Sequence, residues 1–564
     1  MKSRVRDSVV KVKDSQGLVF KYLIWMAALI SISMSPWTNM DSLIIPKLAI
    51  LFATSLSLIP FILSYRNFIL QTIIGKLLIL ISVLIILQLL LVVWFTPAPF
   101  EQQFYGRTGR GLGFATELAI ILILLSSTLS FRLEAKGTLQ VGLIASCYFT
   151  SLYSIGQRLG FDLFDWVTRT NGIVGTLGNP NFQSSFAAMA LIPTATYFWW
   201  RKNGKFLTIL AILPLVILIY LSESTQGYLI SLVVIGIYML LYFWYSRKRL
   251  FYVFVTIFLL LQSIVLLGIF NKGPFASIIY KISIQSREDF YRVSIAIAND
   301  HPLFGVGLDS LGDNYLKYWN PDITSSIGEF ADNSHNSFLQ YASTGGYPLA
   351  ILQYLIPFLV IYSFFKIQKF YGKFNSFYTA LFSAWIAFQL QALISPSNIA
   401  MLMWNAVISG ALLGSALMIT KQDMIHSKDI RLNFIKPLMY FLFIAGLVII
   451  YPLYKVDNLY VVANKTGDGD LAIESALSFP ESSIRYARIG RVLLESNLLP
   501  QALELGRAAV KFNPNAPSAW ALILLNNSAP LEERVKAKQE VLRLDPFNME
   551  IRGIQFPPEL DPGN

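Results

Sequence analysis

The stretch on which the rest of the chain depends is residues 283–347, SIQSREDFYRVSIAIANDHPLFGVGLDSLGDNYLKYWNPDITSSIGEFADNSHNSFLQYASTGGY. It is the longest internal stretch without the run of about 20 apolar residues that a membrane-crossing helix needs. Two of the three histidines, His301 and His335, lie within it, together with Arg287 and Arg292. The apolar segments on either side therefore decide where this polar stretch is placed.

The composition of the 564-residue chain predicts an all-α, polytopic helical membrane protein. Hydrophobic residues make up 55% of the chain and charged residues only 14%, which is too apolar for a soluble globular protein. The single cysteine, Cys147, lies in an apolar run, so an internal disulfide and a thiolate metal cluster are both excluded. The first apolar run lacks a small-residue cleavage site and is interpreted as a span rather than a signal peptide.

About 13 apolar segments have the length of a membrane span. They lie near residues 18–35, 43–63, 74–95, 112–130, 138–156, 182–200, 206–221, 226–244, 251–270, 338–365, 375–394, 398–419 and 437–454. The sequence thus predicts a basic N-terminus at 1–17 and a membrane domain at 18–454. Within that domain, residues 271–337 form a large loop.

The positions of Lys and Arg predict the orientation. With the N-terminus in the cytoplasm, the segments on its side carry 23 of these residues. The short loops on the other side carry Arg107, Arg110, Arg158 and Arg169, with Lys47 at a span end. Because cytoplasmic loops are the basic ones, the 271–337 loop and the C-terminal tail are expected outside the cytoplasmic (inner) membrane. The basic charge is thereby explained as a topological signal, and no nucleic-acid binding is predicted.

Residues 457–564 form a polar tail with a helical pattern. Prolines recur at 480, 514 and 546, at intervals close to the tetratricopeptide period. Residues of the size that this repeat requires occupy the expected positions: Tyr486, Ile489, Gly490, Leu493, Ala502 and Ala509. We predict an extracytoplasmic TPR-like domain that leans on the membrane domain or binds a protein partner; a single helical hairpin is the alternative. Asp468 and Asp470 are interpreted as helix-capping residues rather than as a metal site.

Five arginines on the predicted outer side are candidates for binding a diphosphate. Basic residues are depleted from the outer loops of membrane proteins, so the arginines that remain there are expected to have a specific role. The guanidinium group is a permanently charged, bidentate ligand of phosphate. The candidates are Arg107, Arg110, Arg169, Arg287 and Arg292. Pairing with nearby acids is the structural alternative for each. Glu117, a carboxylate within a predicted span, is an expected partner of Arg107 or Arg110.

His335 is the candidate catalytic base. Asp332 or Ser334 is expected to cap the helix that begins here, which places His335 in its first turn. A helix N-terminus disfavours imidazolium, so the ring stays neutral and can accept a proton. A solvated or capping histidine is the alternative, and His301, which precedes a proline in a turn, is interpreted as structural.

Several motifs in order resemble those of the O-antigen ligase and polymerase superfamily. They are GTLGNPNF at 175–182, Arg-x-x-x-Tyr-Arg at 287–292, HPLFGVGLDS at 301–310 and HNSFLQYASTGG at 335–346. By motif, Arg287 and His335 match the family's functional arginine and histidine best, and Arg169 matches less closely. Tyr291 stands where the family usually has Trp. The tail resembles an appendage that some members carry.

The resemblance implies a GT-C-type glycosyltransferase that needs no metal or cofactor. Such an enzyme takes a glycan from undecaprenyl diphosphate outside the membrane and passes it to a glycan, lipid or protein hydroxyl. We expect inversion at the anomeric carbon, because no carboxylate nucleophile is paired with an acid. Polymerase and ligase both remain open. A transporter or exporter of a glycan or lipid, with the tail as a docking module, is the alternative from another class.

Overall fold

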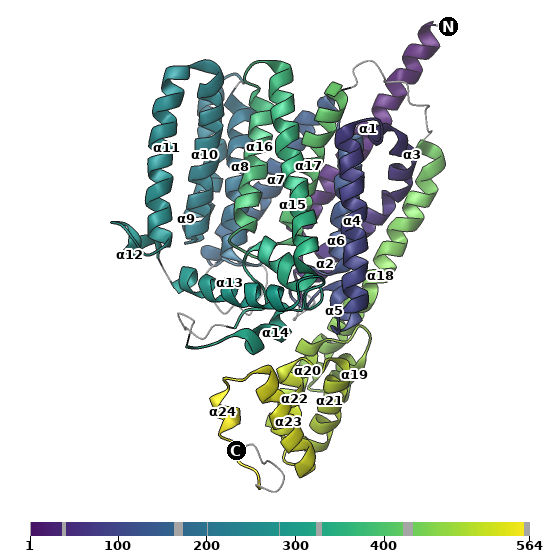
Figure 1. Cartoon of the computed structure of the whole chain (residues 1–564). Helices are drawn as coiled ribbons and strands as arrows, with labels where there is room; N and C mark the ends of the chain where they lie inside the picture. The colour runs from purple at the N-terminus through teal and green to yellow at the C-terminus, as the bar shows by residue number, and fades with distance from the viewer. Residues whose placement is uncertain are drawn as a thin grey trace.

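The computed structural model describes residues 2–35, 41–162, 173–199, 201–280, 282–322, 330–420 and 432–557. Within these ranges all regular secondary structure is helical and no strand occurs, which confirms the predicted all-α class. Most helices stand side by side in one bundle, and a smaller group of helices lies beyond one end of it (Figure 1).

The bundle contains a helix for every apolar segment predicted from the sequence. Its helices are α1 (Lys2–Ile32), α2 (Ile44–Ser57), α3 (Ile59–Ile69), α4 (Ile73–Phe95), α6 (Phe114–Ser130), α7 (Lys136–Arg158), α8 (Pro180–Trp199), α9 (Gly204–Leu221), α10 (Thr225–Ser246), α11 (Lys248–Ile269), α15 (Ser337–Tyr371), α16 (Ser376–Ala392), α17 (Ile399–Thr420) and α18 (Leu432–Thr466). The predicted span 43–63 is divided between α2 and α3, which are bent by 53°.

Length and hydropathy qualify eight helices among the described residues as membrane spans, or nine if α2 and α3 together form one. Apolar side chains also cover the outside of the bundle. In the most apolar part of α11, for example, no residue is buried against the rest of the protein. The acyl chains of a bilayer would cover such an apolar surface, whereas its exposure to water would be energetically unfavourable. The protein is therefore a multi-pass membrane protein, and the number 13 stays a prediction.

Helix α17 forms the centre of the bundle and packs closely against α6. Small residues make this approach possible. A Cβ atom added at Gly410 would lie 2.4 Å from the Ser127 side chain, and one at Gly414 would lie 2.5 Å from the Thr128 carbonyl oxygen. Small residues at helix crossings are the usual means of close packing inside membranes.

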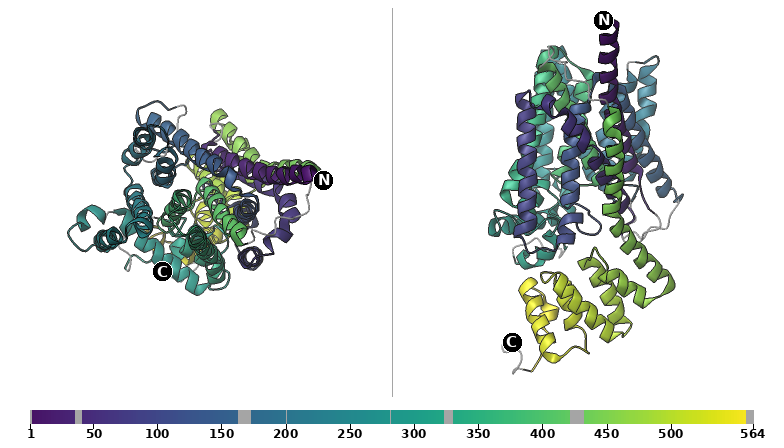
Figure 2. Two further views of the ribbon diagram at one scale, coloured as in Figure 1. Left: turned by 90° about the horizontal axis from the view of Figure 1, so that it is seen from above. Right: turned by 90° about the vertical axis from the view of Figure 1, so that its right-hand side faces the viewer.

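The polar loop and the tail share the end of the molecule opposite the N-terminus (Figures 1 and 2). The loop folds into α12 (Ala276–Ile279), α13 (Ile282–Asp300) and α14 (Leu311–Tyr318), next to the short α5 (Phe100–Tyr105). Helix α13 lies across the end of the bundle (Figure 1). The side of the membrane that this end faces stays a prediction.

The tail is a stack of short helices. After α18, which runs without a break out of the bundle, come α19 (Gly469–Leu477), α20 (Ser483–Glu495), α21 (Leu499–Phe512), α22 (Pro517–Leu524), α23 (Leu531–Leu544) and α24 (Met549–Arg552). Each of these helices packs on the next. The aromatic and small residues noted in the sequence, such as Tyr486 and Ala502, are buried between them. Asp468 caps α19, as predicted. The helical tail is thus confirmed, whereas its repeat class stays a prediction.

Candidate functional site

The HPLFGVG turn is locked onto the start of α15. The Val306 N–H donates to the Ser343 carbonyl over 3.0 Å, and the Gly307 N–H donates to the Thr344 carbonyl over 3.2 Å. These carbonyls are accessible because Gly346, at φ 80°, breaks the helix. The side-chain amide of Gln88 on α4 completes the junction by donating to the Leu303 and Gly345 carbonyls. The two Gly-rich motifs of this stretch therefore form one rigid joint.

Helix α13 places Arg287 beside the turn that follows α16. Its apolar stripe, including Phe290, Val293 and Ile297, is buried against α14 and the following loop. The Arg287 Nε–H donates to the Ile394 carbonyl over 2.9 Å, and the Tyr291 hydroxyl donates to the neighbouring Leu393 carbonyl. The guanidinium is thereby held half-buried at the turn that follows α16.

His335 lies just before α15 rather than in its first turn. Its φ is 54°, a left-handed conformation that residues other than glycine rarely adopt. Its N–H donates to the Asn333 side chain over 2.9 Å, and Asn336 caps the helix by accepting from the Leu339 N–H. The prediction that Asp332 or Ser334 caps this helix is therefore wrong.

The imidazole of His335 is half-buried, and its surroundings disfavour protonation. It packs on the Phe290 ring at a centroid distance of 5.1 Å, and its Nδ1 has no hydrogen-bond partner among the described residues. Burial, reinforced by the positive charges of Arg110 and Arg287, lowers the pKa of His335 to about 3, although Asp332 opposes the shift. The ring is therefore a neutral base at physiological pH.

Arg110 reaches this histidine from the turn at 106–113. Its Nη2 and Nε donate to the two carboxylate oxygens of Asp332 over 2.5 and 3.2 Å. Although burial opposes it, this pairing holds the pKa of Asp332 below its usual range. Because Asp332 precedes His335 by three residues, the pair ties the arginine turn to the histidine segment.

Arg107 is held in a different ion pair. Its Nη1 donates to an oxygen of Asp313 over 2.6 Å, and both side chains are largely buried. Its backbone N–H and that of Leu112 donate to one oxygen of Asp309, while the other oxygen of Asp309 is buried without a hydrogen-bond partner in the described part of the chain. Burial raises the pKa of Asp309 to about 6, although these hydrogen bonds oppose the shift. The arginine turn is thus built on the carboxylates of Asp309 and Asp313.

Glu117 does not pair with either arginine, contrary to the expectation. Its oxygens accept from the Tyr341 hydroxyl over 3.1 Å and from the Gln353 side-chain amide over 2.8 Å. Two neutral donors from α15 thus satisfy a carboxylate inside the bundle, where an unpaired charge would be costly. No feature of the local sequence around Glu117 indicates these partners, which are more than 220 residues away.

Arg292 and His301 are exposed and pair elsewhere. Arg292 is on the exposed face of α13, where it pairs with Glu288 one turn earlier. Arg169 lies outside the described residues. His301 is exposed, with its Nε2 3.4 Å from the Tyr318 hydroxyl. Of the four predicted arginines that the structure describes, Arg110 and Arg287 are the two whose charges act on the histidine.

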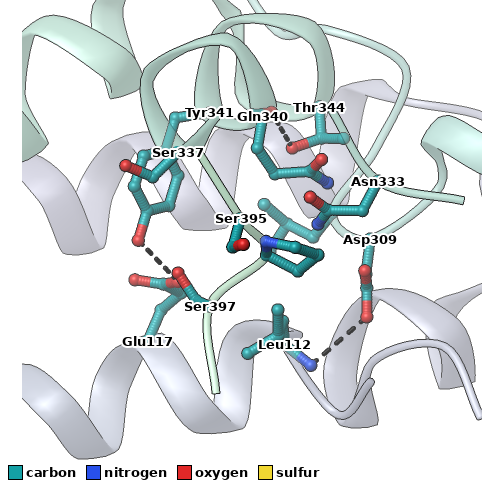
Figure 3. A pocket seen from close by; sticks show the side chains of 12 residues that line it. Leu112, Glu117, Asp309, Asn333, Ser337, Gln340, Tyr341, Thr344, Ser395 and Ser397 are labelled. Carbon is teal, nitrogen blue, oxygen red and sulfur yellow. Dashed lines mark hydrogen bonds between the residues drawn. The ribbon is translucent and has the colours of Figure 1, made fainter. Parts of the chain in front are cut away.

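A small, partly open cleft of about 30 Å³ adjoins the His335 segment (Figure 3). Its lining includes Asn333 and Ser337, two positions to either side of His335, but not His335 itself. Glu117 and Asp309 lie on opposite sides of the cleft, with hydroxyl and amide side chains between them (Figure 3). The cleft can therefore accommodate a neutral polar group that donates hydrogen bonds.

Residues 209–354 match the family model described as O-Antigen ligase. The matched segment runs from α9 into α15 and includes Arg287 and His335, whereas the turn carrying Arg107 and Arg110 and the whole tail lie outside it. No curated protein matches the chain. The match supports the resemblance noted from the motifs. Together with the apolar helices, it supports a multi-pass membrane protein with a role in glycan ligation or polymerisation.

Proposed function

We propose that this protein is an inverting, metal-independent glycosyltransferase of GT-C type in the cytoplasmic membrane. It would transfer a glycan from undecaprenyl diphosphate to an acceptor hydroxyl on the extracytoplasmic side. One observation carries the proposal: the half-buried His335, whose Nδ1 has no hydrogen-bond partner among the described residues, lies close enough to Arg110 and Arg287 for both positive charges to disfavour its protonation. A base beside two fixed cations suits a reaction that deprotonates a hydroxyl and releases a diphosphate.

The arginines would bind the diphosphate of the donor. Asp332 orients Arg110, and the Ile394 carbonyl orients Arg287. Two guanidinium groups held from different segments match the several oxygens of a diphosphate better than a single cation does. They would also stabilise the charge that develops on the leaving group, so a metal ion would not be required for this step.

The acceptor would approach through the cleft. Its hydroxyl proton would pass to His335 while the oxygen attacks the anomeric carbon of the donor. The bond from that carbon to the diphosphate oxygen would break, and undecaprenyl diphosphate would leave with the bonding electrons. Direct displacement of this kind inverts the anomeric configuration.

Donor binding would itself activate the base. In the absence of substrate, the two arginines lower the pKa of His335. A bound diphosphate would offset both positive charges and bring its own negative charge close to the ring. The pKa of His335 would then rise toward its usual range, so that His335 becomes a stronger base when the donor is in place.

The test is mass spectrometry of undecaprenyl-linked glycans from cells that carry the wild type, no copy, Arg287→Ala or Arg292→Ala. The last variant is the matched control, because Arg292 lies on the exposed face of the same helix. Accumulated single repeat units in the null and Arg287→Ala strains would indicate a polymerase, and accumulated long lipid-linked chains a ligase. A normal pattern with Arg287→Ala beside a defective null strain would contradict the proposed diphosphate site.

A further inference from the structure

The C-terminal tail touches the turn that carries the arginines. The hydroxyl oxygens of Thr108, in the turn, and Ser482, at the start of α20, are 2.8 Å apart. The side-chain amide of Asn513, which follows α21, donates to Asp313 of the loop over 3.0 Å. Asn513 and Asp313 are both buried, with exposed fractions of 1% and 5%. The contact between Asn513 and Asp313 is thus shielded from water, and a hydrogen bond is electrostatically stronger in such a place than in water.

The turn needs such contacts to keep its shape. Gly106, Gly109 and Gly111 have φ values of 87°, 85° and 63°, so three of its residues adopt backbone conformations that glycine reaches at little cost. The same glycines add no side-chain contacts to hold the turn. Its position is instead set by partners from outside, including Asp41, whose carboxylate accepts from the Gly109 N–H over 3.0 Å.

Asp313 joins three segments of the chain at one carboxylate. One oxygen accepts from Arg107 of the turn. The other accepts from the Gln102 amide of α5 over 2.8 Å and from the Asn513 amide of the tail over 3.0 Å. Asn513 is 200 residues from Asp313 in sequence, yet it supplies one of the three donors. Removing this donor leaves a buried charge with one partner fewer.

We propose that the tail contributes to donor binding by positioning the arginine turn. In this proposal, Asn513 and Ser482 are positioning residues that hold the 106–113 turn so that Arg110 faces His335. The inference rests on the proposed function, because it assigns the tail to the binding of the same diphosphate. It does not depend on the repeat class of the tail or on a protein partner for it.

The first test is Asn513→Asp, which is nearly isosteric. The aspartate keeps the oxygen that accepts from the Asn515 N–H, so the local turn of the tail is preserved. It replaces the donor with a second carboxylate facing Asp313. Asn526→Asp is the matched control: its amide donates to the Leu499 carbonyl inside the tail, away from the turn. We expect Asn513→Asp to weaken donor binding about tenfold at neutral pH and the control to leave it unchanged.

A pH signature separates positioning from general damage. Two carboxylates in contact raise the pKa of one of them, so acidification puts a proton between them and restores a hydrogen bond. Donor binding by Asn513→Asp relative to the wild type should therefore recover as the pH falls to about 5.5. A tail that had simply unfolded would not recover in this way.

The second test is a cross-link. Thr108→Cys with Ser482→Cys would place two sulfur atoms where two hydroxyl oxygens now lie 2.8 Å apart, and the longer C–S bonds would bring the sulfurs toward the disulfide length of about 2 Å. The native Cys147 is buried and would not compete. We expect the oxidised cross-link to restore donor binding in Asn513→Asp relative to the reduced form of the same protein. Donor binding that stays as weak after oxidation as in the reduced form would overturn the proposal.

Two readouts keep the inference separate from the proposed function. The first is turnover of lipid-linked glycan extracted from the null strain. The second is binding of inorganic pyrophosphate, followed by the NMR signal of the His335 ring. Wild-type protein that binds pyrophosphate without turnover would refute the proposed function alone. Unchanged pyrophosphate binding in Asn513→Asp would refute the role of the tail alone.

Discussion

The protonation of His335 is the most direct test of the site. With a pKa of about 3, the ring should stay neutral over the whole range in which the protein is handled. At pH 5 a histidine with the reference pKa of about 6.5 would be about 97% protonated, whereas one with a pKa of 3 would be about 1% protonated. The two cases therefore differ almost completely at a single, mild pH.

Histidine-selective isotope labelling makes the measurement practical, because the chain contains three histidines. The ring signal that disappears in His335→Asn is assigned to His335. The wild-type protein in detergent is then titrated from pH 8 to pH 5. We expect the His335 signal to keep the chemical shift of the neutral ring throughout.

Arg110→Gln is the perturbation that probes the cause. Burial is the largest contribution and remains, but the variant removes one cation and leaves the Asp332 carboxylate without its partner. Both changes favour imidazolium, so the pKa of His335 should rise by about one unit or more. Arg292→Gln, on the exposed face of α13, is the control and should change nothing. A wild-type His335 that titrates near pH 6.5 would refute the reasoning, because the ring would then be hydrated.

Three further substitutions test the joint and the pair around the site. Gly346→Ala should destabilise the protein by about 2 kcal/mol or more in thermal unfolding, because its Cβ would lie 2.3 Å from the Leu303 carbonyl. Gly372→Ala, at a similar φ of 61° but in open space, should cost less, and an equal loss would contradict the packing explanation. Gln88→Leu should cost about 2 kcal/mol in the same assay, because it removes the donor to two carbonyls; an unchanged melting temperature would show that water replaces the amide. Arg110→Lys keeps the charge but loses the two-point pair with Asp332, so glycan transfer should fall about tenfold at an unchanged protein level; full activity would show that charge alone suffices.

The sequence predicted the helices well because helix formation in a membrane is a local matter. Every predicted apolar segment coincides with a helix or, at 43–63, with a bent pair. A backbone in a bilayer must satisfy its own hydrogen bonds, so an apolar run of sufficient length has few alternatives to a helix. The tail helices followed from the same periodic pattern of small and apolar residues.

The local sequence was less informative about the partners of the charged residues. Arg107 and Arg110 are separated by two residues, yet one pairs with Asp313 and the other with Asp332. The expected partner, Glu117, instead accepts from Tyr341 and Gln353. Each of these contacts joins residues more than 200 positions apart, and the intervening sequence contains no signal for such a pairing.

The sequence by itself determined the all-helical membrane bundle, the polar stretch between α11 and α15, and the presence of Arg287 and His335 in that stretch. Hydrophobicity and helical periodicity operate within a few turns of chain, and so they can be read from composition and spacing. Only the tertiary structure decided which arginines lie near the histidine, how desolvation keeps the histidine ring neutral, and where the tail contacts the arginine turn. Those features depend on desolvation and on charges brought together from distant segments, and both exist only once the chain has packed.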